Sequence, residues 1–112
     1  MTKEKIPSFG EYLRTLRENA GLPLRKVAAA LDIDPSLLAK IERDERRPTK
    51  NLIKLISEIF KQDEHKLNIA FLSDQIAYQV LDEEDGMEAF KVAEEKIKYF
   101  KKSNPEKILK NK

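Results

Sequence analysis

Apolar residues recur at helical spacing near the start of the chain. Steps of four, three and four residues place them on one face of an α-helix. They are Phe9, Leu13, Leu16 and Ala20. Ser8 and Glu11 fit the capping box that begins a helix, and Gly21 suits the left-handed residue that ends one. We therefore predict a first helix between Ser8 and Gly21, with Arg17 on its solvent-facing side.

Two shorter apolar segments follow and are separated by a turn. The first comes after Pro23 and has its apolar positions at Leu24, Val27, Ala28 and Leu31. The second begins at Pro35, a residue favoured at the first helical position, with Asp34 as its N-cap. It is predicted to run to about Arg43. Its inward-facing positions are Leu38 and Ile41.

Two longer segments complete the first part of the chain. Thr49 is suited to cap a fourth helix, whose apolar positions are Leu52, Leu55, Ile56, Ile59 and Phe60. Asp63 is suited to cap a fifth helix, which is predicted to run to about Phe71.

The pattern predicts two more helices beyond Leu72. Ser73 is a candidate cap for a helix with apolar positions at Ile76, Ala77, Val80 and Leu81. The acidic run 82–85 favours the start of a last helix, with a narrow stripe of Met87, Phe90, Ala93, Ile97 and Phe100. The fold class is therefore predicted to be all-α, with five helices followed by two amphipathic C-terminal helices.

The composition agrees with a helical protein and disfavours catalysis. The 112 residues are 38% charged and 40% hydrophobic, and three Gly are few for a β-rich fold. Cys is absent and His65 is the only histidine, so we expect no thiol chemistry, no metal site and no cofactor. No apolar run is long enough for a signal peptide or a membrane span, so a cytoplasmic protein with no membrane partner is expected.

The charges are sorted along the chain. Residues 1–62 carry 13 Lys and Arg against nine Asp and Glu, whereas residues 63–95 carry two Lys against ten acids. Residues 96–112 carry seven Lys and one Glu. All six Arg lie between Arg14 and Arg47, and Arg is well shaped for bidentate contacts with phosphate or guanine. The first half of the chain is thus the part suited to an anionic partner.

Several of these features occur together in one known family. The stretch from Phe9 to about Lys61, extended by the fifth helix to about Phe71, resembles the lambda-repressor-like, Xre-type helix-turn-helix regulators. The resemblance rests on Leu13-Arg14-x-x-Arg17-x-x-x-Gly21-Leu22, Val27-Ala28-x-x-Leu31-x-Ile33, Ser36-x-Leu38-x-Lys40-Ile41-Glu42-Arg43 and Arg47-Pro48-Thr49. It implies a sequence-specific regulator of transcription, a repressor or controller protein, that places its third helix in the DNA major groove.

The resemblance also implies which residues bind double-stranded DNA. The expected base contacts are Pro35, Ser36, Leu37, Ala39 and Lys40. The expected phosphate contacts are Arg17, Arg25, Lys26, Arg43, Arg46 and Arg47. Glu42 is expected to orient a neighbouring Arg rather than to meet DNA.

Some positions depart from the family pattern. Pro23 and Leu24 stand where helix 2 usually opens with Ser or Thr followed by Gln, which removes one phosphate anchor. Asp32 and Asp44 stand where Gly is usual, and Gly adopts a left-handed backbone at lower cost. Asp44, with Asp34 and Glu45, also brings negative charge near the expected interface.

The two C-terminal helices have two interpretations. They either fold back onto their own domain or pair across a two-fold axis to form a homodimer, which we favour because a dimer doubles the contacts on a palindromic operator. The expected dimer interface comprises Ile76, Val80, Met87, Phe90, Ala93, Ile97 and Phe100. The expected organisation is a flexible 1–7, a DNA-binding domain 8–72, a dimerisation extension 73–102 and a flexible Lys-rich tail 103–112. A rival interpretation is an antitoxin or adaptor that binds a partner protein through these helices.

Overall fold

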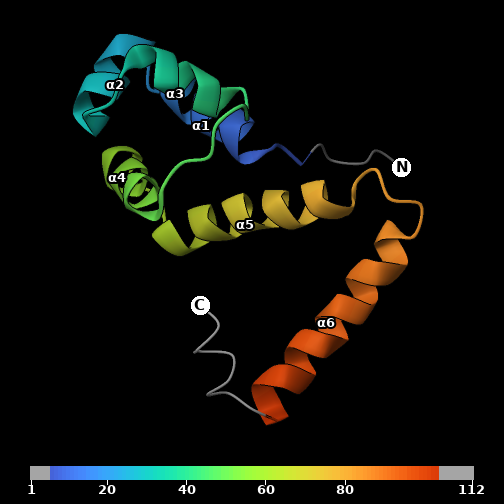
Figure 1. Ribbon diagram of the computed structural model, residues 1–112. Coiled ribbons are helices and arrows are strands. Elements are labelled where there is room, and N and C mark those ends of the chain that lie inside the picture. Colours follow the sequence, from blue (N-terminus) through green and yellow to red (C-terminus); the bar gives the residue numbers. More distant parts are fainter. Residues whose placement is uncertain (1–5, 104–112) are drawn as a thin grey trace, which may run out of the picture. The chain divides into compact units, whose positions relative to one another are not determined.

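The computed structural model describes residues 6–103, which form six α-helices and no strand. Their bounds are α1 Phe9–Asn19, α2 Leu24–Leu31, α3 Pro35–Glu42, α4 Lys50–Phe60, α5 Glu64–Val80 and α6 Gly86–Ser103 (Figure 1). The predicted all-α class is confirmed. The expectations for residues 1–5 and 104–112 lie outside the described residues. The contacts divide the chain into two compact units, 1–74 and 75–112.

The helix ends of the first unit follow the local signals in the sequence. The Ser8 hydroxyl accepts a hydrogen bond from the amide of Glu11, whose carboxylate accepts one from the amide of Ser8, each at 3.1 Å. Thr49 caps α4 through the amide of Leu52 at 3.0 Å. Gly21 follows α1 with φ +68°. The predicted caps of α1 and α4 and the predicted end of α1 are confirmed.

The core of the first unit lies among α1 to α5. The buried apolar side chains are Phe9, Leu13, Val27, Ala28, Leu31, Leu38, Ile41, Leu52, Ile53, Ile56 and Leu67. Helix α3 packs against α1 and α2, and α2 also packs against α4 (Figure 1). The predicted stripe of α4 omitted Ile53, which is fully buried.

A three-residue turn joins α2 to α3. Asp32 ends α2 in the left-handed region with φ +58°, as expected at a position where glycine is usual. Asp34 then precedes Pro35, which is the first residue of α3. Because Asp34 makes no capping bond through its side chain, the fixed φ of Pro35 is the clearest local signal for this helix start.

Helix α5 corrects the predicted break at Ser73. The segments expected to be two helices form one helix of 17 residues, Glu64–Val80, so the described chain has one C-terminal helix fewer than predicted. The Ser73 hydroxyl donates to the carbonyl oxygen of Ala70 within the helix at 2.9 Å instead of capping a new one. No Gly or Pro lies between Glu64 and Val80, so nothing interrupts the backbone hydrogen bonds.

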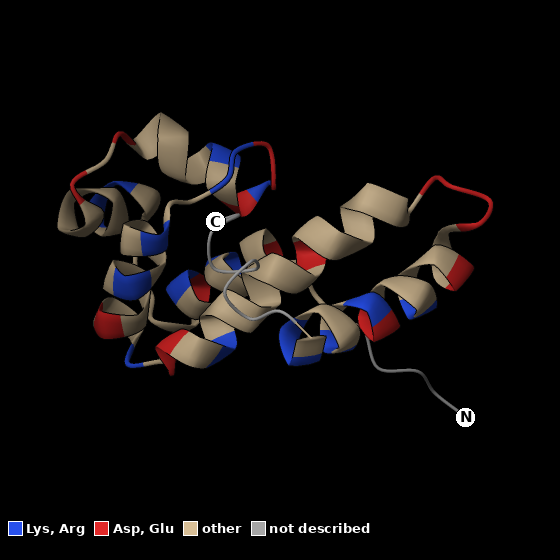
Figure 2. Ribbon diagram, turned by 60° about the horizontal axis from the view of Figure 1, so that its bottom comes forward, with Lys and Arg blue, Asp and Glu red and all other residues tan. Residues whose placement is uncertain are grey.

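The second unit contains the end of α5, the acidic loop and α6. The acidic residues Asp82 to Asp85 form the loop between the two helices, coloured red in Figure 2. Helix α6 begins directly after them at Gly86, as the sequence predicts. A Cβ on Gly86 would collide with the carbonyl oxygen of Val80, so this tight turn requires glycine. Among residues 6–103, no helix is long and apolar enough to cross a membrane.

Candidate nucleic-acid interface

Helix α3 has one buried and one exposed face. Leu38, Ile41 and Glu42 are buried, with 0%, 1% and 7% of their surface exposed. Each helical residue turns by about 100°, so Ser36, Lys40 and the following Arg43 project to the opposite side. Ser36, Lys40 and Arg43 are all exposed. The core thus holds one side of α3 and leaves a polar stripe on the other.

The other predicted base contacts lie beside this stripe. Pro35 is exposed at the start of α3, and Ala39 is half-buried at one margin. Leu37 lies at the other margin and packs partly against the core. The structure therefore brings Pro35, Ser36 and Lys40 together on the surface, with Ala39 beside them and Leu37 turned toward α4.

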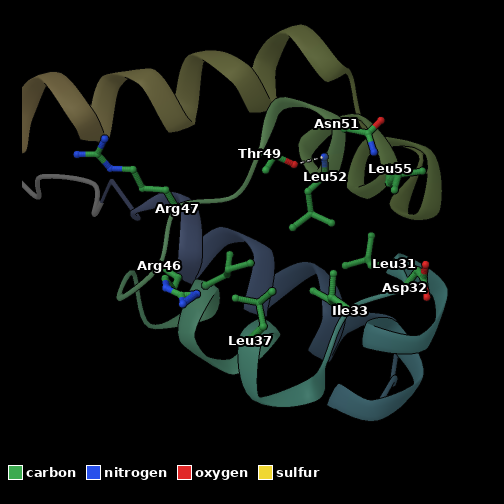
Figure 3. Close-up of a pocket in the computed structure, with 11 residues that line it drawn as sticks. Leu31, Asp32, Ile33, Leu37, Arg46, Arg47, Thr49, Asn51, Leu52 and Leu55 are labelled. Atoms are coloured by element: carbon green, nitrogen blue, oxygen red, sulfur yellow. Dashed lines mark hydrogen bonds between the residues drawn. The ribbon is translucent and has the colours of Figure 1, made fainter.

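Leu37 lines a groove between the α2–α3 turn, α3 and α4. The groove has a volume of about 470 Å³, and Figure 3 shows Leu31, Ile33, Leu37 and Leu52 directed into it. Arg46 and Arg47, from the loop after α3, also line the groove, although the Arg47 side chain extends away from it in the same view.

Arg17 lies on the inner side of α1, which corrects its predicted solvent-facing position. Its Nε and Nη2 atoms donate to the Glu42 carboxylate at 2.7 and 3.0 Å, and Nη1 donates to the carbonyl oxygen of Leu22 at 3.0 Å. The hydrogen bonds to Glu42, which outweigh the effect of burial, raise the pKa of Arg17 above its ordinary value. The expectation that Glu42 orients a neighbouring Arg is confirmed. Because all three guanidinium nitrogens have partners within the domain, Arg17 holds α1 against α3 rather than offering a free cation to phosphate.

Arg43 lies on the exposed stripe but is paired. Its Nε and Nη2 atoms donate to the Glu45 carboxylate at 2.9 and 3.2 Å. The hydrogen bond from Arg43 lowers the pKa of Glu45, so this carboxylate is ionised at neutral pH. Glu45 therefore compensates the charge of Arg43 at the end of the stripe.

The side chains of four other predicted phosphate contacts are exposed to solvent. Arg25 and Lys26 lie in the first turn of α2, and Arg46 and Arg47 lie in the loop after α3. Within the described residues 6–103, none of these four side chains forms an ion pair. They therefore supply positive charge on α2 and in the loop after α3 that no ion pair among the described residues compensates.

The comparison with protein families agrees with this arrangement. The family described as a helix-turn-helix domain matches residues 8–68, which is more than half of the chain. The chain belongs to the helix-turn-helix domain family. In this helix-turn-helix domain α2 and α3 are the paired helices, and a DNA-binding role for the domain follows. Searches of curated proteins and of solved structures gave no match.

Asp44 makes contacts in the helix-turn-helix domain that the sequence pattern does not predict. Its carboxylate accepts hydrogen bonds from the Ser8 hydroxyl at 2.5 Å and from the Gly10 amide at 2.9 Å. The expected negative charge near the interface is therefore directed at the N-terminus of α1, where unpaired N–H groups and the helix dipole favour an anion. The only signal in the sequence was an Asp at a loop position where glycine is usual, and Asp44 has φ +63°.

Asp74 provides a second long-range contact to the same helix end. Its carboxylate accepts a hydrogen bond from the Phe9 amide at 2.7 Å. The Phe71 ring, one turn earlier in α5, meets the Phe9 ring edge to face at a centroid distance of 6.0 Å. The beginning of α1 is thus tied both to the loop after α3 and to the middle of α5.

The predicted dimer residues belong to α5 and α6 and are mostly exposed. Ile76 is 49% exposed, and the four large side chains of the α6 stripe are also exposed. These four are Met87, Phe90, Ile97 and Phe100. Ala93 is exposed, and Val80 is half-buried at the end of α5.

Proposed function

We propose that this protein is a sequence-specific, double-stranded-DNA-binding regulator of the lambda-repressor-like, Xre type, which acts as a repressor or controller of transcription. It inserts α3 into the major groove of a palindromic operator and binds as a homodimer. The observation that carries this proposal is the polar stripe of α3, which faces solvent while the opposite side of the helix is locked into the core. Packing against the core therefore fixes the orientation of α3 in the absence of DNA.

The stripe offers suitable chemistry for reading base edges. Lys40 donates to the acceptor atoms of guanine, and the Ser36 hydroxyl pairs with either base type. Pro35 and Ala39 lie beside them and supply apolar contact to a thymine methyl group. Leu37 contributes from the margin next to the groove.

The phosphate contacts position this reader without contributing sequence information. Four exposed cations are available for this role: Arg25 and Lys26 on α2, and Arg46 and Arg47 after α3. Arg43 joins them when phosphate displaces Glu45 from its guanidinium. Each neutralised phosphate releases condensed counterions, so the affinity is expected to fall linearly with salt on a logarithmic scale.

The apolar face of the C-terminal helices supports the homodimer. Such a face, exposed to water on a single chain, favours association with another surface. Pairing two copies places two α3 helices on half-sites about one helical turn apart, roughly 34 Å. The two-fold symmetry of the protein then matches that of a palindrome.

Selection of bound sequences from a random DNA pool tests the proposed function. The expected product is a palindrome with half-sites separated by about one turn. The matched control is the Ser36→Ala, Lys40→Ala double variant, which leaves the core of α3 untouched and should lose most of the enrichment. A pool that shows no enriched sequence with the unaltered chain would overturn the proposed readout.

The same exposed face also favours a second candidate function, an antitoxin or adaptor that binds a different protein through its C-terminal helices. Sedimentation of the purified chain separates the two. A stable dimer at micromolar concentration supports the regulator, whereas a monomer supports the adaptor.

A further inference from the structure

Helix α6 exposes a row of large apolar side chains that needs a partner surface. The exposed fractions are 67% for Met87, 39% for Phe90, 54% for Ile97 and 50% for Phe100. Most of the stability of a helix in a protein comes from packing of its apolar face rather than from helix propensity. The row is therefore a surface that favours association with a partner.

The spacing of this row is the same in both directions along the helix. Three residues separate Met87 from Phe90, seven separate Phe90 from Ile97, and three separate Ile97 from Phe100. A second α6 in the reversed direction thus presents large side chains at matching heights. Ala93, a small residue near the centre, lets two helices approach closely there.

The charges along this region distinguish the two possible directions. Residues 82–95 carry seven acids and one Lys, whereas residues 96–102 carry four Lys and no acid. Packed helices lie about 8 to 10 Å apart, which is close to the Debye length of about 8 Å at physiological salt. A parallel pair brings acids against acids and lysines against lysines, whereas an antiparallel pair brings each acidic end against a basic end.

Contacts within one copy leave most of this basic charge available. Lys98 approaches Glu94 and Glu95 of its own helix at 4.0 and 3.7 Å. Within the described residues, Lys96, Lys101 and Lys102 form no ion pair. These lysines can therefore face the acidic residues of a reversed second copy.

We propose that a second copy of this chain docks on α6 in the antiparallel direction, an inference that rests on the proposed homodimer. Met87 then lies near the partner's Phe100, and Phe90 lies near the partner's Ile97. The two-fold axis passes close to Ala93. The acidic loop 82–85 of each copy lies beside the basic end of the other.

Single-cysteine variants of the full chain test the direction, because the natural sequence has no Cys. In an antiparallel pair, Ala93→Cys forms a disulfide with itself, and Met87→Cys forms one with Phe100→Cys when the two variants are mixed. In an antiparallel pair the two copies of each end residue lie 13 helix positions apart, which is about 20 Å. This is far beyond the ~4.4 to 6.8 Å Cα separation of a disulfide, so neither end variant links to itself. Self-linking of both end variants without mixed linking would overturn the proposal.

A spin label on Ser103→Cys provides an independent reading at an exposed position that leaves both the apolar row and the lysines in place. Two labels of an antiparallel pair are expected about 25 Å or more apart, and those of a parallel pair about 10 Å apart. A short distance would overturn the antiparallel direction and leave the homodimer standing. A purified chain that sediments as a monomer would overturn both the antiparallel direction and the homodimer. The readout of DNA sequence by α3 is tested independently, by the selection of bound sequences.

Discussion

At the scale of single residues, Arg17 and Glu42 hold α1 against α3 through a buried ion pair. Their side chains are 12% and 5% exposed, and the Nε–Oε2 distance is 2.7 Å. Removal of one partner leaves an uncompensated buried charge. Glu42→Ala should therefore lower the free energy of unfolding by about 3 kcal/mol in urea denaturation.

The pair Arg14–Glu18 provides the control for this prediction. It has a similar distance of 3.0 Å, but its side chains are 62% and 53% exposed. Glu18→Ala should change the free energy of unfolding by only about 0.3 to 0.5 kcal/mol. Equal losses in the two variants would contradict a structural role for the buried pair.

Asp44 affects stability in two ways, through its hydrogen bonds to Ser8 and Gly10 and through its left-handed backbone, and different substitutions separate the two. Asp44→Gly removes the contacts to Ser8 and Gly10 but tolerates φ +63°, so a loss of about 1 kcal/mol is expected in urea denaturation. Asp44→Ala adds the cost of a left-handed alanine, roughly 1 kcal/mol more. Asp34→Ala is the control, because Asp34 makes no capping bond, and should stay within about 0.5 kcal/mol. If Asp34→Ala lowers the free energy of unfolding as much as Asp44→Ala does, the role assigned to Asp44 is wrong.

Glu45 limits the charge that Arg43 offers to DNA. Glu45→Gln removes the carboxylate that accepts from Arg43 and one negative charge beside the loop of Arg46 and Arg47. DNA affinity at neutral pH should therefore rise for operator and random sequences alike, with a steeper dependence on salt. Fluorescence anisotropy titrations at several salt concentrations measure this effect, and an unchanged affinity would argue against Arg43 as a phosphate contact.

The residues whose contacts differ from the sequence-based predictions all bind partners that are distant in sequence. Arg17 lies four residues after the buried Leu13 and so follows the inner row of α1, although its charge suggested a solvent-facing position. Its partner Glu42 is 25 residues away, and Asp44 reaches Gly10 across 34 residues. Local pattern identifies which positions are polar, but tertiary packing decides which polar groups meet.

At the scale of helices, the local signals located α1 to α4 well and failed within α5. The helix starts at Phe9 and Lys50 follow caps formed by neighbouring residues, which sequence displays directly. Ser73 has the same chemistry as a cap but lies where the backbone continues as helix, and its hydroxyl bonds to the preceding turn. A cap residue thus predicts a helix start only where something also ends the helix before it, such as Gly21.

The packing of α1 on α3 depends on a glycine. A Cβ on Gly10 would lie 2.6 Å from the carbonyl oxygens of Ile41 and Glu42, so one of the two helices must move. Gly10→Ala should therefore lower the midpoint of thermal unfolding and weaken operator binding together, because α3 shifts with the helix that supports it.

Comparison of Gly21→Ala with Gly10→Ala distinguishes the effect of backbone strain from that of steric crowding between helices. Gly21 has φ +68° but open space around its Cβ position, so only the left-handed backbone is penalised, by roughly 1 kcal/mol. This variant should lose stability but keep its operator affinity when measured well below its unfolding temperature. If both glycine variants weaken operator binding equally, the close approach of α1 and α3 is not what positions α3 for DNA binding.

At the scale of the whole molecule, the two halves of the chain expose different kinds of side chains. The exposed cations Arg25, Lys26, Arg46 and Arg47 belong to the helix-turn-helix domain. The acidic loop and the apolar row of α6 belong to the second unit. Sequence pattern alone located both features, because charge and periodicity are local properties.

The central claim is that the outer stripe of α3 reads base sequence while the flanking cations hold phosphate. Equilibrium binding of Lys40→Ala and Arg47→Ala to the selected operator and to random DNA, across a range of salt, tests it most directly. Lys40→Ala should weaken operator binding by ~1 to 3 kcal/mol and leave binding to random DNA nearly unchanged. Arg47→Ala should weaken both and reduce the salt slope by about 1. Equal losses on operator and random DNA for Lys40→Ala would contradict the account.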